Sequence, residues 1–164
     1  MEDQLQISLE LMRETDIDEA VGVICDAMDE NEAGWAKRTM ELCFACGKYG
    51  IDSGREYYVW RHERQICGLV GLHRNVWGPE ENVWLSWFAV RPDYQQMGAG
   101  ALMDTIQEQA VKAGYKKLFI ETYEHPTFEK AHSFYKSKGF QQVGRVENYL
   151  SDGSAMLVFG MQIA

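Results

Sequence analysis

Proline and internal repeats are both scarce in this sequence. Three prolines occur among 164 residues, and no segment recurs at the periods of roughly 20 to 50 residues that mark solenoids. Hydrophobic residues make up 46% of the chain and aromatic residues 12%, which is far richer than a disordered segment. A chain of this length supplies one hydrophobic core but not two. We therefore expect a single folded domain over residues 1–164.

Long hydrophobic runs are also absent. The longest apolar stretch, residues 83–90, is far shorter than the roughly 20 residues that a membrane-spanning helix needs. The first four residues are acidic and polar, so they lack the basic flank and apolar run of a signal peptide. These features predict a cytoplasmic protein with no membrane partner.

Positive charge is in deficit. Lys and Arg together number 16 against 25 Asp and Glu, for a formal net charge of −9. Nucleic-acid binding requires clustered Lys and Arg to neutralise phosphates, so we expect no nucleic-acid partner. An acidic surface can steer a cationic ligand toward the protein, and it is equally typical of an ordinary soluble protein.

Groups of metal ligands are missing too. Cys43 and Cys46 form a single C-x-x-C pair, whereas a structural zinc site needs a second such pair or a pair of histidines. The four histidines are scattered along the chain. We expect no metal, and we expect the cysteines to pack as small apolar side chains.

The hydrophobic periodicity predicts an α/β protein with the order β-α-α-β-β-β-α-β-α-β-β. Helices inserted between strands favour a mixed sheet that is covered on both faces. The strands are expected at residues 7–12, 57–60, 66–72, 83–90, 118–123, 141–150 and 156–163, and the helices at 17–28, 35–47, 98–113 and 131–138.

The clearest chemical signal follows the central strand, at residues 90–100. A strand, a short turn and the glycines Gly98 and Gly100 lead into a helix. Such a helix start presents free N–H groups to an anion, and glycines let a phosphate approach the backbone closely. The segment is neither a Rossmann fingerprint nor a P-loop. It is typical either of a diphosphate that is held and not cleaved, or simply of a helix start.

This segment resembles motif A of the GNAT N-acetyltransferase superfamily, Val-x-Pro-x-(Tyr/Phe)-(Gln/Arg)-x-x-Gly-x-(Gly/Ala). The matching residues are Val90, Pro92, Tyr94, Gln95, Gly98 and Gly100. Residues 131–140 resemble motif B of the same family, Ala-x-x-Phe-Tyr-x-x-x-Gly-Phe. The resemblance implies a mixed, mostly antiparallel sheet of about seven strands, flanked by about four helices.

The same resemblance implies that acetyl-CoA is the cosubstrate, bound between the central strand and the strand that follows it. The Phe88 N–H would face the thioester carbonyl, and backbone amides at the helix start would hold the diphosphate. The implied binding residues are Phe88, Ala89, Val90, Gln95, Gln96, Met97, Gly98, Ala99, Gly100 and Ala101.

Two residues are candidates for acid and base. Tyr135 matches the motif B tyrosine that acts as general acid toward the CoA sulfur in many family members, although a helix aromatic at this position also suits a core. Glu121 lies in the apolar segment 118–123, where burial would raise its pKa, and it resembles by position the base of bacterial enzymes that acetylate ribosomal proteins. A glutamate near the end of a strand can equally be solvated or paired. Other family members carry a glutamate on the central strand. Here Trp84, Ser86 and Phe88 occupy that strand, so the base is either Glu121 or a chain of water molecules.

The acceptor is expected to be a primary amine on a small molecule or a peptide N-terminus. Carboxylates and aromatic side chains suit a cationic amine, and His125 could relay protons. The candidate acceptor residues are Asp26, Asp29, Glu30, Glu32, Trp35, Trp77, Glu80, Glu81, Trp84 and Tyr149. Phe128 replaces an asparagine that contacts CoA in the ribosomal-protein enzymes, which argues against close identity with them. Homodimers are frequent in the family, so the resemblance implies a homodimer.

Two alternatives to an enzyme remain open. A non-catalytic acyl-CoA-binding regulatory module could use the same fold. A nucleotide- or flavin-binding α/β domain would instead bind NAD, FMN or ATP.

Overall fold

The computed structural model describes residues 6–164, so the polar start at residues 1–4 lies outside the described part. The order of strands and helices is the predicted one. The strands are β1 Leu9–Leu11, β2 Arg55–His62, β3 Gln65–His73, β4 Asn82–Val90, β5 Lys117–Tyr123, β6 Gln141–Val146 and β7 Met156–Gln162; the helices are α1 Ile17–Ala27, α2 Glu30–Lys48, α3 Gln95–Lys112 and α4 Glu129–Ser137.

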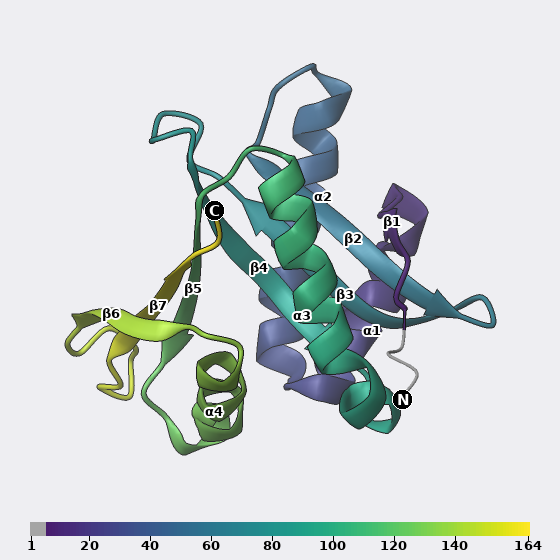
Figure 1. Ribbon diagram of the computed structural model, residues 1–164. Coiled ribbons are helices and arrows are strands. Elements are labelled where there is room, and N and C mark those ends of the chain that lie inside the picture. The colour runs from purple at the N-terminus through teal and green to yellow at the C-terminus, as the bar shows by residue number, and fades with distance from the viewer. Residues whose placement is uncertain (1–5) are drawn as a thin grey trace.

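The seven strands form one sheet in the order β1-β2-β3-β4-β5-β7-β6. Its neighbouring strands are antiparallel except for β4 and β5, which are parallel. In Figure 1, α3 crosses in front of the sheet, with α1 and α2 behind it and α4 beside β5 and β6. The mixed, mostly antiparallel sheet with helices on both faces is therefore confirmed.

Each face of the sheet has its own hydrophobic core. On one face, Val23 and Ile24 of α1 and Met40 of α2 pack on β2 and β3. On the other face, Leu102 and Ile106 of α3 pack with side chains from β3, β4, β5 and β7. The apolar residues of α1 and α3 recur at helical spacing, so each helix buries one side.

Three helices begin earlier than the sequence pattern predicts: α4 by two residues, at Glu129, and α2 and α3 by more. Helix α2 begins at Glu30 because the Asp29 side chain accepts the Glu32 N–H at 2.8 Å and caps it, as N-terminal Asp residues commonly do. Helix α3 begins at Gln95, directly after a 3-10 turn over Pro92–Tyr94. The glycines at 98 and 100 consequently lie inside α3.

Strand β6 ends at Val146, four residues before the predicted end. Asn148 adopts a left-handed conformation with φ of 53°, which asparagine tolerates better than most residues. The Tyr149 N–H then donates to the Ser154 carbonyl oxygen at 3.0 Å. This turn directs Tyr149 back toward β5, where its ring stacks on Tyr123.

The four cysteines are free thiols. Cys67 is buried, and Cys25, Cys43 and Cys46 are half-buried. Within residues 6–164, no three His, Cys, Asp or Glu side chains gather in a way that could hold a metal ion. In the same part of the chain, no helix combines the length and apolar character needed to cross a membrane.

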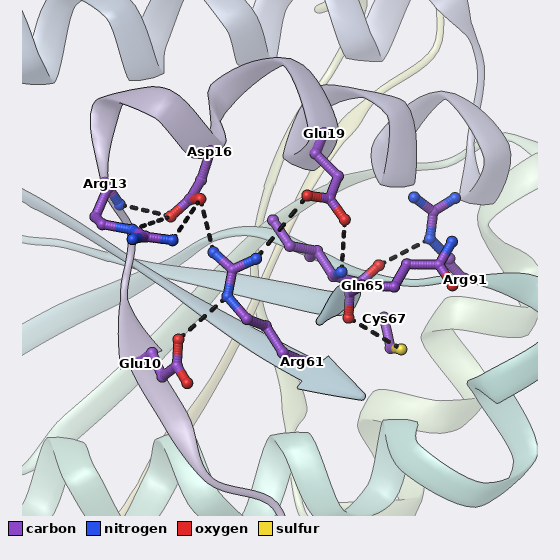
Figure 2. A network of polar contacts seen from close by, with 9 residues as sticks. Glu10, Arg13, Asp16, Glu19, Arg61, Gln65, Cys67 and Arg91 are labelled. Atoms are coloured by element: carbon purple, nitrogen blue, oxygen red, sulfur yellow. Dashed lines mark hydrogen bonds and ion pairs between the residues drawn. The ribbon is translucent and has the colours of Figure 1, made fainter. Parts of the chain in front are cut away.

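A polar network ties α1 to the sheet, as Figure 2 shows. Arg61 of β2 pairs with Asp16 at 2.6 Å and with Glu10 at 3.1 Å. Burial acts to raise the pKa of Asp16, but hydrogen bonds from Arg13 and Arg61 outweigh it and hold that pKa below its usual value. The network therefore stabilises the start of α1 through an almost fully buried carboxylate.

The same network fixes the turn that leads from β4 into α3. Arg91 follows β4 and donates its Nε–H to the Ile66 carbonyl oxygen at 2.8 Å, while its Nη1 contacts Asp26 at 2.8 Å. The Ile66 N–H in turn donates to the Glu19 carboxylate at 2.7 Å. Figure 2 shows the bonds of Glu19 and Arg91 to β3, which join α1 to the residue that follows β4. The pair of Arg91 with Asp26 adds a direct link to α1, so α1 helps to set the position of the α3 N-terminus.

Candidate active site

Strands β4 and β5 run side by side for only a short distance. They pair over Asn82–Trp84 and Lys117–Phe119 and do not pair beyond these residues. Figure 1 shows the two strands diverging toward the end of the sheet where α4 lies. We call the unpaired region, residues 85–90 of β4 and 120–123 of β5, the splay. Main-chain groups of β4 that face the splay lack a strand partner, so a ligand can hydrogen-bond to them.

A β-bulge lies in β4 at the splay. Leu69 pairs with Ala89 and Gly71 pairs with Ser86, so one residue of β3 faces both Trp87 and Phe88. Trp87 has a φ of 57°, a left-handed conformation that is strained for a bulky residue. Its indole Nε1–H donates to Thr39 Oγ1 of α2 at 2.8 Å, which holds the bulge in place. Bulges re-aim neighbouring backbone groups, and here the affected residue is Phe88.

The N-terminus of α3 offers a small number of free amides. The Tyr94 N–H donates to Arg91 and the Gln95 N–H to Pro92. The next amides, those of Gln96 and Met97, belong to the first helical turn, where N–H groups have no helical acceptor. Both residues are exposed. These two amides, together with the helix dipole, are the groups at this end of α3 that can bind an anion.

Other residues predicted to bind the cosubstrate have structural contacts of their own. The Gln95 side chain donates from Nε2 to the Val90 carbonyl oxygen at 3.1 Å, closing the turn between β4 and α3. Ala99 and Ala101 pack against the core on the α3 face. Phe88 lies with its ring centroid 5.8 Å from that of Phe134 in α4, so α4 packs beside the unpaired part of β4.

Gly98 has a packing role that the sequence analysis did not predict, beside the predicted close approach of a phosphate. Gly98 is buried, and a Cβ at this position would lie 2.3 Å and 2.4 Å from two ring carbons of Trp60 in β2. Such a separation is far below the roughly 3.5–4.0 Å between two carbon atoms in normal contact. The glycine is therefore required so that α3 can pack closely on the sheet.

Gly100 differs from Gly98, and it reveals a residue that the sequence analysis missed. A Cβ at Gly100 would lie 3.4 Å from Lys138 Nζ, and that ammonium pairs with Asp104 at 2.9 Å. Lys138 follows α4, yet the fold brings its charge to the second turn of α3. The sequence signal was the basic residue before Gly139 in motif B, which the sequence analysis read only as the end of a helix.

Glu121 does not have the environment expected for it. The sequence places it in an apolar strand, but the side chain is exposed, so the expected burial is wrong. Glu121 lies on a part of β5 that α1 and α2 do not cover. Its Oε1 accepts a hydrogen bond from the Tyr123 hydroxyl at 3.0 Å. Burial, followed by the charge of Glu121, raises the pKa of Tyr123 well above its usual value.

Glu32 of α2 approaches the same end of β5. It is half-buried, and its pKa is raised first by burial and then by the negative charges of Asp29 and Glu121. Tyr149 from the turn between β6 and β7 stacks on Tyr123 with ring centroids 6.0 Å apart. Residues from α2, β5 and the last hairpin thus converge on one acidic and aromatic group.

Tyr135 of α4 is buried among aromatic side chains. Its ring centroid lies 6.1 Å from those of Phe140 and Phe159, and the residue is 9% exposed. Burial raises the pKa of Tyr135 to about 12. The phenol therefore stays protonated at neutral pH and retains its O–H donor.

Glu30 and Trp35 are exposed on α2, and the other predicted acceptor residues, together with the proton-relay candidate His125, fall into three sets. Glu32, Trp84 and Tyr149 lie near the splay, and Trp84 packs on Phe119 at its start, with ring centroids 5.1 Å apart. Others have structural roles: Asp26 pairs with Arg91, Asp29 caps α2, and His125 accepts the Thr127 N–H at 3.2 Å to begin a 3-10 turn. Trp77, Glu80 and Glu81 precede β4, at the opposite end of that strand from the splay.

Comparison with solved structures shows the same fold. A GNAT-family protein from Desulfovibrio desulfuricans superposes with a TM-score of 0.84 at 18% identity, covering 96% of this chain and 99% of that chain. The ribosomal-protein-S18-alanine N-acetyltransferase from Escherichia coli gives 0.72 at 19% identity, covering 97% and 95%. An aminoglycoside 6'-N-acetyltransferase complexed with coenzyme A gives 0.75 at 12% identity, covering 96% and 97%.

Sequence comparison gives a result at the level of the family. No curated protein matches this chain. A sequence model described as the acetyltransferase (GNAT) family matches residues 14–140, which span α1 to α4 and include the splay, the bulge and the α3 N-terminus. The protein therefore belongs to the GNAT acetyltransferase family.

Proposed function

We propose that this protein is an N-acetyltransferase that transfers an acetyl group from acetyl-CoA to a primary amine within a ternary complex. The observation that carries the proposal is the splay itself. It combines an unpaired, bulged half-strand of β4 with the free amides that begin α3 and with a glutamate on the facing strand. Extended main chain suits the amide-containing pantetheine arm of CoA, and a helix N-terminus suits its diphosphate.

The chain contains residues to hold each part of the cosubstrate. The main chain of Phe88, Ala89 and Val90 would bond the pantetheine arm, and the Gln96 and Met97 amides would bond the diphosphate. Lys138, whose charge lies beside Gly100, would add an ion pair to a phosphate oxygen. Most of these contacts come from the backbone, so they tolerate the replacement of the family asparagine by Phe128.

The chemistry requires that an amine lose a proton and attack the thioester carbon. Glu121 would take that proton directly or through water, since its carboxylate is exposed at the splay. The Phe88 N–H would donate to the carbonyl oxygen as negative charge develops there. When the carbon–sulfur bond breaks, the Tyr135 hydroxyl would donate its proton to the departing thiolate.

A substrate screen tests the proposal. The purified full chain is incubated with acetyl-CoA and a panel of primary amines and peptides, and the release of free thiol is measured together with the mass of the acetylated product. We expect CoA and an N-acetylated amine to appear in equal amounts. Binding of acetyl-CoA without any acetylated product would refute the enzyme and support the regulatory acyl-CoA-binding module. Binding of NAD, FMN or ATP in place of CoA would support a nucleotide-binding domain.

A further inference from the structure

Arg55 has an unusual environment for a partly buried charge. It lies on β2, it is half-buried, and its Nη1 donates to Ser86 Oγ of β4 at 3.3 Å. Within residues 6–164, no carboxylate lies within ion-pair distance of the Arg55 guanidinium. Arg38 and Arg64 also lack a carboxylate partner in this part of the chain, but both are exposed. A guanidinium has five N–H donors, and withdrawing its charge from water is unfavourable without an anion. Its unneutralised charge, after burial, lowers the pKa of His73 on the neighbouring strand.

Tyr57 adds a second unsatisfied polar group beside Arg55. It lies two residues further along β2, on the same face; the residue is 3% exposed, and its buried hydroxyl has no hydrogen-bond partner in the described part of the chain. Its ring lies across Gly71 of β3, since a Cβ there would lie 2.8 Å and 2.9 Å from two ring carbons and 2.7 Å from the Ser86 carbonyl oxygen. The ring of Tyr57 and the side chain of Arg55 therefore both reach across β3 toward Ser86.

The strand register places Ser86 opposite Glu121 across the splay. Trp84 and Phe119 are partners in the parallel pair of β4 and β5, and Ser86 and Glu121 each follow by two residues on the same face of the sheet. Paired strands are about 4.8 Å apart, but β4 and β5 are no longer paired at these two residues and diverge there, and Arg55 lies beyond Ser86. The gap between the guanidinium and the Glu121 carboxylate is therefore wider than the spacing of two paired strands. An amine and a carboxylate a few bonds apart, with a hydrogen bond of about 2.9 Å at each end, fit a gap of this kind.

We propose that the acceptor is zwitterionic: an amino acid, or a closely similar amine, whose carboxylate binds Arg55 and the Tyr57 hydroxyl while its amine lies on the side of Glu121 and Glu32. The geometry supplies a cationic group and a neutral donor on the β2–β4 side and carboxylates on the β5 side. A guanidinium can bind a carboxylate through two parallel hydrogen bonds, which also orients the amine toward the splay. This inference rests on the proposed acetyl transfer and specifies its substrate class.

The first test compares amino acids with their amides as acceptors. The amide keeps the side chain and the amine but removes the negative charge. Its α-amine titrates near the value of a chain terminus, about 7.7–8.0, so more of it is unprotonated at neutral pH and reactivity alone favours the amide. We expect the wild-type kcat/KM to be at least tenfold higher for free amino acids nevertheless.

The second test uses three variants. Arg55→Gln should raise KM for amino acids at least tenfold and bring the ratio of acid to amide close to one, whereas Arg55→Lys should retain part of the preference because it keeps the charge but loses the planar fork. Arg38→Gln, an exposed arginine on α2, is the matched control and should leave the ratio unchanged. Tyr57→Phe should raise KM for amino acids without lowering Tm, because it removes a hydroxyl that is unpartnered in the free protein.

The outcomes separate this inference from the proposed function. The proposal of a zwitterionic acceptor is wrong, and the proposed acetyltransferase stands, if two results are found together. Amino acid amides, or amines that lack the carboxylate, are acetylated with the same kcat/KM as amino acids, and Arg55→Gln slows all of these classes equally. If Tyr57→Phe lowers Tm and leaves KM unchanged, the hydroxyl has a structural role and the proposed site is wrong. If no amine of any class yields an acetylated product, the proposed function and this inference both fail.

Discussion

Substituting Gly98 by alanine tests whether the motif A glycine serves packing or phosphate binding. The added Cβ would lie 2.3 Å and 2.4 Å from ring carbons of Trp60, so the ring must retreat by more than about 1 Å to reach a normal carbon contact. Trp60 is 7% exposed and packs edge-on against Tyr94 with centroids 5.8 Å apart, which leaves it little space. Overpacking of this kind costs about 1–3 kcal/mol, and the gain in helix propensity from Gly to Ala is about 1 kcal/mol. We expect a net loss of up to about 2 kcal/mol.

Gly100→Ala is the matched control. The added Cβ would lie 3.4 Å from Lys138 Nζ, the flexible end of a side chain, so we expect no overpacking and a gain of up to about 1 kcal/mol from helix propensity. The free energy of unfolding is measured by urea titration and Tm by circular dichroism. Each kcal/mol shifts Tm by about 2–4 °C for a chain of this size, so the two variants should move in opposite directions.

A double variant tests the assigned contact. Trp60→Phe removes the outer ring carbons that the new Cβ would meet, so it should cost less stability in the Gly98→Ala background than alone. CoA affinity is measured by calorimetry in parallel. The packing argument is refuted if Gly98→Ala is as stable as wild type while both glycine variants lose CoA affinity, since that pattern identifies close phosphate approach as the reason for the glycines.

Four further predictions concern single side chains. Glu121→Gln should lower kcat about 100-fold or more, as expected for loss of a general base, and should lower the pKa of Tyr123, measured by alkaline phenolate absorbance, because that pKa is raised in part by Glu121; an unchanged kcat would exclude Glu121 as the base. Tyr135→Phe should lower kcat by a similar factor and leave the Kd of CoA unchanged, and normal turnover would remove Tyr135 from the mechanism. The pKa of Glu32 is raised above 4.5, first by burial, so stability falls as pH rises through that raised pKa; Glu32→Gln should be more stable than wild type to urea at neutral pH and equal to it well below pH 4.5, and equal stability at pH 7 would contradict the assignment. The pKa of Asp16 is held below 3.8 because its hydrogen bonds outweigh burial. Its contribution to the free energy of unfolding is therefore present above pH 3.8 and is lost as pH falls through the lower pKa of the folded state. Asp16→Asn should lose on the order of 2 kcal/mol at neutral pH, and the urea curves of the variant and the wild type should converge in acid.

Local patterns were sufficient to predict the element order. The apolar residues of α1 and α3 recur at helical spacing, and β4 is a nearly continuous apolar run, so each element is identified by its own residues. The predicted helix boundaries were less accurate, because they depend on single hydrogen bonds. Asp29 extends α2 toward its N-terminus by capping it, and the 3-10 turn at Pro92–Tyr94 extends α3.

The candidate site was harder to predict because its members come from distant segments. Glu121 lies in an apolar sequence, but α1 and α2 cover only the other half of the sheet, so its face of β5 is open and the side chain is exposed. Lys138 reaches α3 from the end of α4, and Arg55 reaches Ser86 across an intervening strand. None of these contacts leaves a local pattern in the sequence.

The splay shows why a continuous apolar strand can still be a binding surface. Residues 83–90 have the composition of a central strand covered on both faces, and β4 is indeed the fourth of seven strands. Composition reports what covers the faces of a strand, but it does not report whether both edges are paired. Here the β3 edge is paired along the strand apart from the bulge, whereas the β5 edge is paired only at its start. The unpaired main-chain groups would be a defect in an ordinary sheet, and in this one they are the feature on which the proposed cosubstrate binding rests.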